Sequence, residues 1–225
     1  MRRFGFYSVI ICFLFALSGC QTAYYNAMES FGVHKRDILK ENVEEARDSQ
    51  AEAKEQFQSA LEKFTEVTGF RGGDLELKYK EMKGELERCE DKAEKVRTRI
   101  TKVEDVADAL FNEWEEELEQ YSSRKLRRSS EKQLYATRRQ YEKLDAAMRR
   151  AEEKMDPVLV VFRDQVLYLK HNLNAKAIAS LQDELAAVEE DVAMLVKDME
   201  ASIAEADSFI KTMSEDGNEE PGQAE

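Results

Sequence analysis

Apolar residues recur at alternating spacings of three and four along four long segments of this chain. This spacing is uninterrupted from Leu75 to Trp114. It recurs in segments of comparable length before and after that one. Such spacing puts the apolar residues on one face of an α-helix and is typical of helices that pack along a shared seam. The other segments run from Leu39 to Val67, with Gln50 as a polar exception, from Leu134 to Leu169, and from Ile178 to Met213.

The chain lacks the residues that other fold classes need. Between Glu85 and Asp216 there is no glycine and one proline, Pro157, so this stretch has no turn residues for frequent strand reversals. Ala, Glu, Lys, Leu and Arg make up about half of the chain, a composition typical of long helices. This composition argues against all-β and doubly wound α/β folds.

Turn and cap residues separate the four segments. Gly69, Gly72 and Gly73 can end a helix, and Asp74 offers an N-cap for the next one. Residues 122–129 form a polar connection, after which Ser130 and Gln133 match a capping box. The sequence His171-Asn172-Leu173-Asn174 ends the third helix, with Asn174 as N-cap of the fourth.

Pro157 leaves two interpretations of the third segment. Asp156 and Pro157 could cap and start a new helix. Met155 and Val158 nevertheless keep the apolar rhythm in phase, which favours one continuous, kinked helix.

These signals predict an all-α fold, an elongated antiparallel four-helix bundle or coiled coil. We expect helices at about 24–68, 74–121, 130–173 and 175–213, each spanning roughly 60 to 70 Å. An open rod whose seam is completed by a second copy is the alternative, so homo-oligomerisation stays open. The acidic segment 215–225 has nothing to bury and is expected to be disordered.

The N-terminus has the pattern of a bacterial export signal. Residues 1–19 combine Arg2 and Arg3 with an apolar run that is too short to span a bilayer. The run ends in Leu17-Ser18-Gly19-Cys20, which resembles a lipobox, so we expect cleavage before Cys20, acylation of its thiol (diacylglycerol and palmitate), and a short tether over residues 20–23. Position 21 is Gln and not the Asp of inner-membrane retention, which predicts the periplasmic face of the outer membrane if the source is Gram-negative.

Removing residues 1–19 changes the charge and the cysteine content. The formal net charge of −13 becomes −15, because two arginines and no acids leave. So acidic a chain has no general basic surface for phosphates, and we expect no nucleic-acid partner. Cys12 leaves with the signal and Cys20 is acylated, so Cys89 stays alone on the apolar face of its helix and is expected to be a buried thiol.

Three stretches together resemble a known family: Phe31–Leu39 (FGVHKRDIL), Arg149–Leu159 (RRAEEKMDPVL) and Tyr168–Leu181 (YLKHNLNAKAIASL). The chain is similar over roughly residues 22–214 to a bacterial family of secreted helical proteins of unknown function, some of which carry the label "DNA repair ATPase". The resemblance implies a helical fold and brings no catalytic residues. Residues 69–73 lack the Lys and Ser/Thr of a phosphate-binding loop, so we expect no ATP binding.

The side chains available for catalysis are few. A di-iron bundle needs Glu-x-x-His pairs, but the residues three before His34 and His171 are Phe31 and Tyr168. Two histidines also leave little room for a catalytic triad. We therefore expect no enzyme activity, no metal and no cofactor.

The bundle topology suggests two surfaces that could contact other molecules. The end far from Cys20 would carry a partner-binding tip, formed by Phe70, Arg71, His171, Asn172 and Asn174. The near end would carry a basic connection that contacts lipid headgroups, formed by Arg124, Lys125, Arg127 and Arg128. The sequence thus favours a membrane-anchored scaffold or adaptor with a protein partner in the envelope. The alternative is a protein that binds envelope lipid or peptidoglycan.

Overall fold

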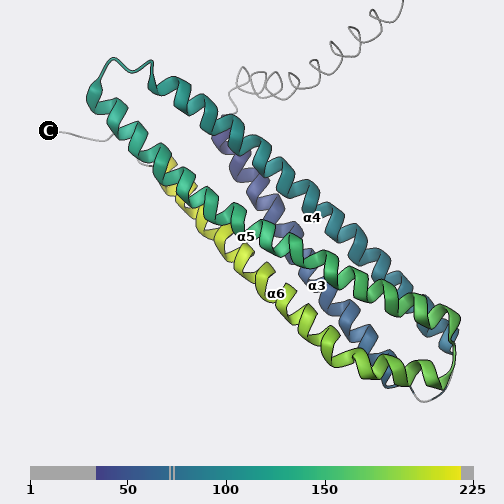
Figure 1. Ribbon diagram of the computed structural model, residues 1–225. Helices are drawn as coiled ribbons and strands as arrows, with labels where there is room; N and C mark the ends of the chain where they lie inside the picture. The colour runs from purple at the N-terminus through teal and green to yellow at the C-terminus, as the bar shows by residue number, and fades with distance from the viewer. Residues whose placement is uncertain (1–33, 71, 73, 219–225) are drawn as a thin grey trace, which may run out of the picture.

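A computed structural model describes residues 34–70, 72 and 74–218 of the chain. Within these residues the chain forms helices and no strands. The helices are α3 (Lys35–Thr68), α4 (Leu75–Leu118), α5 (Arg124–His171) and α6 (Ala175–Asn218). Neighbouring helices run antiparallel in a long rod (Figure 1). The predicted all-α, elongated four-helix bundle is therefore confirmed.

The four helices close into a ring around one core. Each helix packs against two others, in the pairs α3 with α4, α4 with α5, α5 with α6, and α6 with α3. A single chain thus closes its own seam, and the fold needs no second copy to cover an open apolar face. The ion pairs that link neighbouring helices join α3 to α4, α3 to α6 and α4 to α5.

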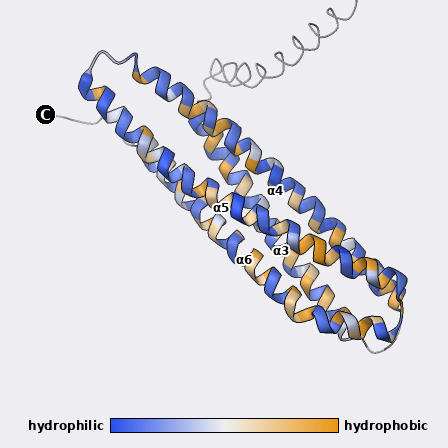
Figure 2. Cartoon of the chain, in the orientation of Figure 1, coloured by the Kyte–Doolittle hydropathy of each residue, from blue (hydrophilic) through white to orange (hydrophobic). Residues whose placement is uncertain are grey.

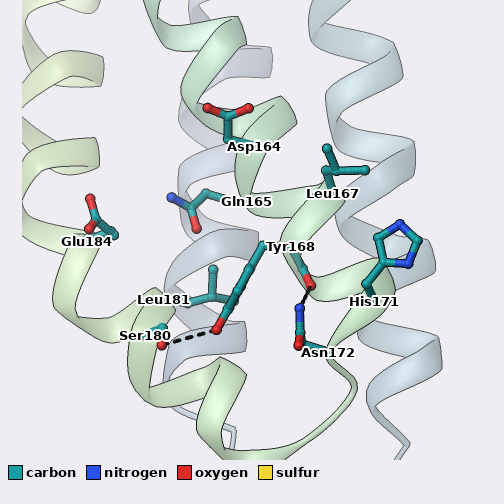
Figure 3. Close-up of a pocket in the computed structure, with 9 residues that line it drawn as sticks. All are labelled: Asp164, Gln165, Leu167, Tyr168, His171, Asn172, Ser180, Leu181 and Glu184. Carbon is teal, nitrogen blue, oxygen red and sulfur yellow. Dashed lines mark hydrogen bonds between the residues drawn. The ribbon is translucent and has the colours of Figure 1, made fainter.

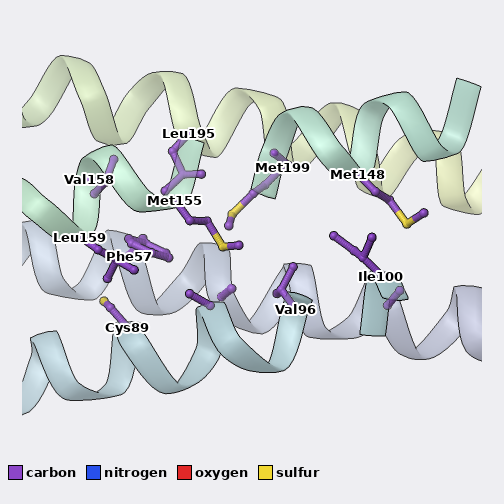
Figure 4. Packing of buried hydrophobic residues seen from close by; sticks show 14 of the residues in the cluster. Phe57, Cys89, Val96, Ile100, Met148, Met155, Val158, Leu159, Leu195 and Met199 are labelled. Carbon is purple, nitrogen blue, oxygen red and sulfur yellow. The ribbon is translucent and has the colours of Figure 1, made fainter. Parts of the chain in front are cut away.

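The seam positions predicted from the apolar rhythm form the core. Apolar and polar residues alternate around each helix (Figure 2), and the buried side chains of all four helices meet along the axis of the rod (Figure 4). Phe57 and Phe162 stack there with ring centroids 6.4 Å apart. Nearly every seam residue is buried, and those that stay partly exposed are Leu75, Tyr79, Trp114, Tyr141 and Leu185.

One layer of the core is polar. Gln50 of α3 and Ser202 of α6 are almost completely buried. The ion pairs Arg47–Asp207 and Lys54–Glu200 join the same two helices on either side, so Gln50 and Ser202 lie at the same level of the rod. Among the described residues, neither amide atom of Gln50 nor the hydroxyl of Ser202 has a hydrogen-bond partner.

The predicted connection between α4 and α5 was too long. Helix α4 ends at Leu118 and not at 121, and α5 begins at Arg124 and not at 130. The N-cap is Ser123, whose hydroxyl accepts a hydrogen bond from the backbone N–H of Leu126. Ser130 lies inside α5 and does not cap it, and its hydroxyl accepts a bond from the indole N–H of Trp114 at 2.8 Å.

The other helix boundaries are close to those predicted. Asp74 caps α4 by accepting bonds from the backbone N–H groups of Glu76 and Leu77. Helix α6 continues to Asn218, so residues 215–218 are helical and not disordered as predicted. Residues 219–225 lie outside the described residues, as do the signal segment, Cys20, the tether and the predicted first ten residues of helix one.

Pro157 lies inside a continuous helix. Helix α5 runs through it from Arg124 to His171, which confirms the interpretation based on heptad phase. Met155 and Val158 are both buried on either side of it, whereas the Pro157 ring is exposed. The core contacts of α5 therefore continue across the proline.

Cys89 is a buried thiol, as predicted. Its side chain is fully covered, and the Sγ atom lies 3.6 Å from the carbonyl oxygen of Gln56. Burial raises the pKa of the Cys89 thiol to about 12, with the contact to Gln56 opposing this shift. The thiolate that would react with oxidants or metals is thus suppressed near neutral pH.

None of the described helices is both apolar and long enough to span a bilayer.

Candidate functional site

A groove lies between α5 and α6 at the end of the rod where α5 finishes and α6 begins. We call this the distal end, since the chain enters α3 at His34 at the opposite end. The groove has a volume of about 730 Å³ and opens to solvent (Figure 3). The distal groove is lined by Asp164, Gln165, Leu167, Tyr168, His171, Asn172, Ser180, Leu181 and Glu184.

The short connection after α5 fixes the mouth of the groove. The Asn172 side chain donates to the carbonyl of Tyr168 at 2.9 Å, which satisfies a carbonyl at the end of α5. Asn174 accepts bonds from the backbone N–H groups of Lys176 and Ala177 at 3.0 and 3.1 Å, which confirms it as the N-cap of α6. Both helix ends are thus held in place at the groove.

Two exposed apolar residues of α5 lie along the groove. Val166 and Leu169 occupy the seam and are buried, so the residues between them, Leu167 and Tyr168, must point away from the core. Leu167 is 52% exposed and Tyr168 is 38% exposed. The Tyr168 hydroxyl lies 3.4 Å from the hydroxyl of Ser180 across the groove (Figure 3).

The groove combines this apolar surface with negative charge. Asp164 of α5 and Glu184 of α6 contribute carboxylates to its walls, and the buried Leu181 contributes to its lining. Neither carboxylate forms an ion pair within the described part of the chain. The groove is therefore suited to a partner segment that carries an apolar side chain next to a Lys or Arg.

The structure divides the predicted tip residues. His171 and Asn172 line the groove. Asn174 is exposed and serves as the cap of α6. Phe70 is half-buried in the connection between α3 and α4 and does not line the groove, and Arg71 lies outside the described residues.

Sequence reasoning missed most of the groove. The sequence Val166-Leu167-Tyr168-Leu169 did carry a signal, because a seam uses only two of four consecutive positions and the other two must face outward. The residues contributed by α6, such as Ser180 and Glu184, gave no such signal. Their place in the groove depends on the register between the two helices.

The predicted basic residues form part of a helix and not of a loop. Arg124, Lys125, Arg127 and Arg128 occupy the first two turns of α5. Arg127 forms an ion pair with Glu119 in the connection. The other three are exposed and have no ion-pair partner among the residues that the structure describes.

The family of the chain follows from the comparison with family models. The model for "Protein of unknown function (DUF2959)" matches residues 24–213. The chain belongs to this DUF2959 family. The family resemblance inferred from three short stretches is thus confirmed, and the matched range contains the distal groove and nearly all of the described bundle.

No curated protein and no solved structure matches this DUF2959 chain. Within its described residues, no group of three or more His, Cys, Asp or Glu side chains is arranged to hold a metal ion.

Proposed function

We propose that this protein is a lipid-anchored rod of the bacterial envelope that holds a protein-binding groove away from its membrane. The observation that carries this proposal is the distal groove, with exposed Leu167 and Tyr168, at the opposite end of the bundle from the start of α3. Helix α5 alone has 48 residues and spans roughly 70 Å. Function then arises from contacts with a protein partner and not from catalysis.

The anchor is the lipidated Cys20, on the periplasmic face of the outer membrane if the organism is Gram-negative. Several acyl chains on one cysteine bind a membrane durably, since each buried methylene contributes about 0.8 kcal/mol. Metabolic labelling with an alkyne palmitate analogue tests this directly. We expect label on the wild-type protein and none on Cys20→Ser, and equal labelling of both would contradict the anchor.

Photocrosslinking in cells tests the groove. A photoreactive amino acid at His171 should capture a partner protein, whereas the same probe at exposed Thr101, in the middle of α4, should capture none. Capture at His171 should be lost when Leu167, inside the groove, is changed to Asp.

The chain offers a matched control for that change. Leu173 is similarly exposed, at 43%, but lies in the connection and does not line the groove. Leu173→Asp should leave capture unchanged. Equal capture at Thr101, or equal loss in both leucine variants, would contradict a specific groove.

The alternative is a protein that binds envelope lipid or peptidoglycan, and the core gives little support to binding of either one inside the bundle. The cavity lined by Ala60, Phe64, Met82, Glu85, Leu86, Phe162 and Val166 has a volume of about 10 Å³. That is about the space of one water molecule and far too small for an acyl chain or a sugar.

A further inference from the structure

We propose that the outward face of the first half of α5 binds the surface of an anionic membrane. This contact goes beyond the proposed partner groove and lies at the other end of the rod. The surface, which we call the cationic face, consists of Arg124, Lys125, Arg128, Lys132 and Arg139, all of them exposed.

Positive charge is concentrated in this one part of an acidic chain. Residues 124–150 contain ten Lys and Arg and three Asp and Glu, a net charge of +7. The whole chain has a formal net charge of −13. The net positive charge on this half of α5 is thus opposite in sign to the net charge of the whole chain. An acidic chain does not need such a positive region for its solubility.

The side of α5 on which a cation lies decides whether it pairs with α4. The cations that face α4 are paired with its carboxylates: Arg138 with Glu115, Arg149 with Glu104 and Arg163 with Glu90. The five residues of the cationic face have no ion-pair partner among the described residues. The cations that face α4 are therefore already matched by carboxylates of the bundle, while the outward ones are available to an external anion.

Exposed apolar side chains accompany these cations. Tyr135 is 55% exposed and lies on the cationic face with Arg128, Lys132 and Arg139. Leu126, which is 57% exposed, and Tyr121 lie beside that face, in the first turn of α5 and in the connection before it. Tyrosine and aliphatic side chains next to Lys and Arg are characteristic of protein surfaces that rest in the headgroup region of a bilayer. A purely ionic partner would give these three side chains nothing to contact.

The position of the face agrees with a membrane contact. Glu113 pairs with Lys35 at the start of α3, so the last residues of α4, the connection and the first turns of α5 extend beyond α3 (Figure 1). The cationic face thus lies on the projecting α4–α5 hairpin, at the end of the rod where the chain enters α3. A lipid anchor at Cys20 would tether that same end.

Trp114 provides a readout in the intact protein. It is the one tryptophan of the chain, and its indole N–H donates to Ser130 of α5, so its fluorescence reports on the hairpin. The full chain is reconstituted into vesicles that contain brominated lipid, which quenches tryptophan at short range. One set of vesicles is phosphatidylcholine alone, and in the other about a third of the lipid is phosphatidylglycerol.

We expect about twofold more quenching in the anionic vesicles, and its loss in high salt, because screening weakens contacts with exposed charges. Each Lys or Arg near an anionic surface strengthens binding about fivefold. The triple variant Arg128→Gln, Lys132→Gln, Arg139→Gln should therefore weaken the contact about a hundredfold and return quenching to the value in neutral vesicles.

The matched control removes three exposed cations elsewhere, through Lys170→Gln, Lys176→Gln and Lys197→Gln, and should quench like wild type. Circular dichroism of both variants checks that the bundle is intact. Equal quenching in neutral and anionic vesicles, or an unchanged triple variant, would overturn the proposal. Quenching that appears only after Glu219, Glu220 and Glu225 are changed to Gln would also overturn it, and would assign the cationic face to the acidic C-terminal segment.

Discussion

Gln50 and Ser202 put polar atoms without a hydrogen-bond partner among the described residues into a core that is mostly apolar. The rhythm of the first segment identified Gln50 as an exception, but nothing in the sequence indicated that it shares a level with Ser202, which belongs to a different helix. That relation follows from the register of α3 against α6, which the ion pairs Arg47–Asp207 and Lys54–Glu200 define. A single sequence does not encode such a register in any local pattern.

The unpaired amide of Gln50 predicts an unusual mutational effect. A buried polar group without a hydrogen bond costs roughly 1 to 3 kcal/mol, so Gln50→Met, which keeps a similar volume, should raise the free energy of unfolding by about that amount. Urea denaturation followed by circular dichroism measures the change. Gln56→Met is the control and should destabilise the protein, because the Gln56 amide donates to Glu85 at 2.6 Å. A loss of stability in Gln50→Met would show that the amide is satisfied in solution.

At the scale of the helices, the apolar periodicity correctly predicted that four helices exist and in which order they follow. It predicted the residues at which they begin and end less well. The seams of all four helices were correct because burial of an apolar stripe dominates helix stability. The predicted start of α5 was wrong because Ser123 and Ser130 are both plausible caps, and no local pattern shows that Ser123 is the cap while Ser130 bonds to Trp114 of another helix. The N-caps Asp74 and Asn174 were correct because each follows a clear break in the pattern.

Pro157 tests the continuity of α5. Proline has no backbone N–H, so the carbonyl four residues earlier, of Glu153, lacks its helical donor. Since the Pro157 ring is exposed, Pro157→Ala should restore that bond without disturbing the core. We expect the free energy of unfolding to rise by about 1 to 2 kcal/mol, less than the full cost of a helical proline because the unfolded chain gains freedom. Val160→Ala, at an exposed position one turn further along α5, should change the free energy of unfolding little. A loss of stability in Pro157→Ala would indicate that α5 is broken at Pro157 in solution.

For the molecule as a whole, the sequence predicted an antiparallel bundle but left open whether one chain closes it. The structure closes the ring through contacts of α6 with α3, the first and last helices of the described bundle. The site was only partly predictable at this scale. His171 and Asn172 were found because they end a helix, whereas the opposite wall of the groove, with Ser180 and Glu184, depends on how α6 packs against α5.

Closure within one chain can be tested by zero-length cross-linking. Lys54 and Glu200 lie 3.4 Å apart across the α3–α6 contact, so a carbodiimide should couple them. Isotopically labelled and unlabelled protein are mixed before coupling. In each linked pair, the two peptides should then be either both labelled or both unlabelled. Lys54→Arg should abolish this product while Lys92 still couples to Glu52 between α3 and α4. Peptides of mixed isotope content would instead show a seam shared between two copies.

The closed ring of four helices in register also limits how such a rod can change during evolution. An insertion in one helix would shift its seam against both neighbours unless they lengthened too. The smallest compatible step is one heptad in each helix, about 28 residues in total, which lengthens the rod by about 10 Å. Relatives of this chain should therefore differ in bundle length by whole steps of this size, and each step would change the distance between the distal groove and the start of α3 by a fixed increment.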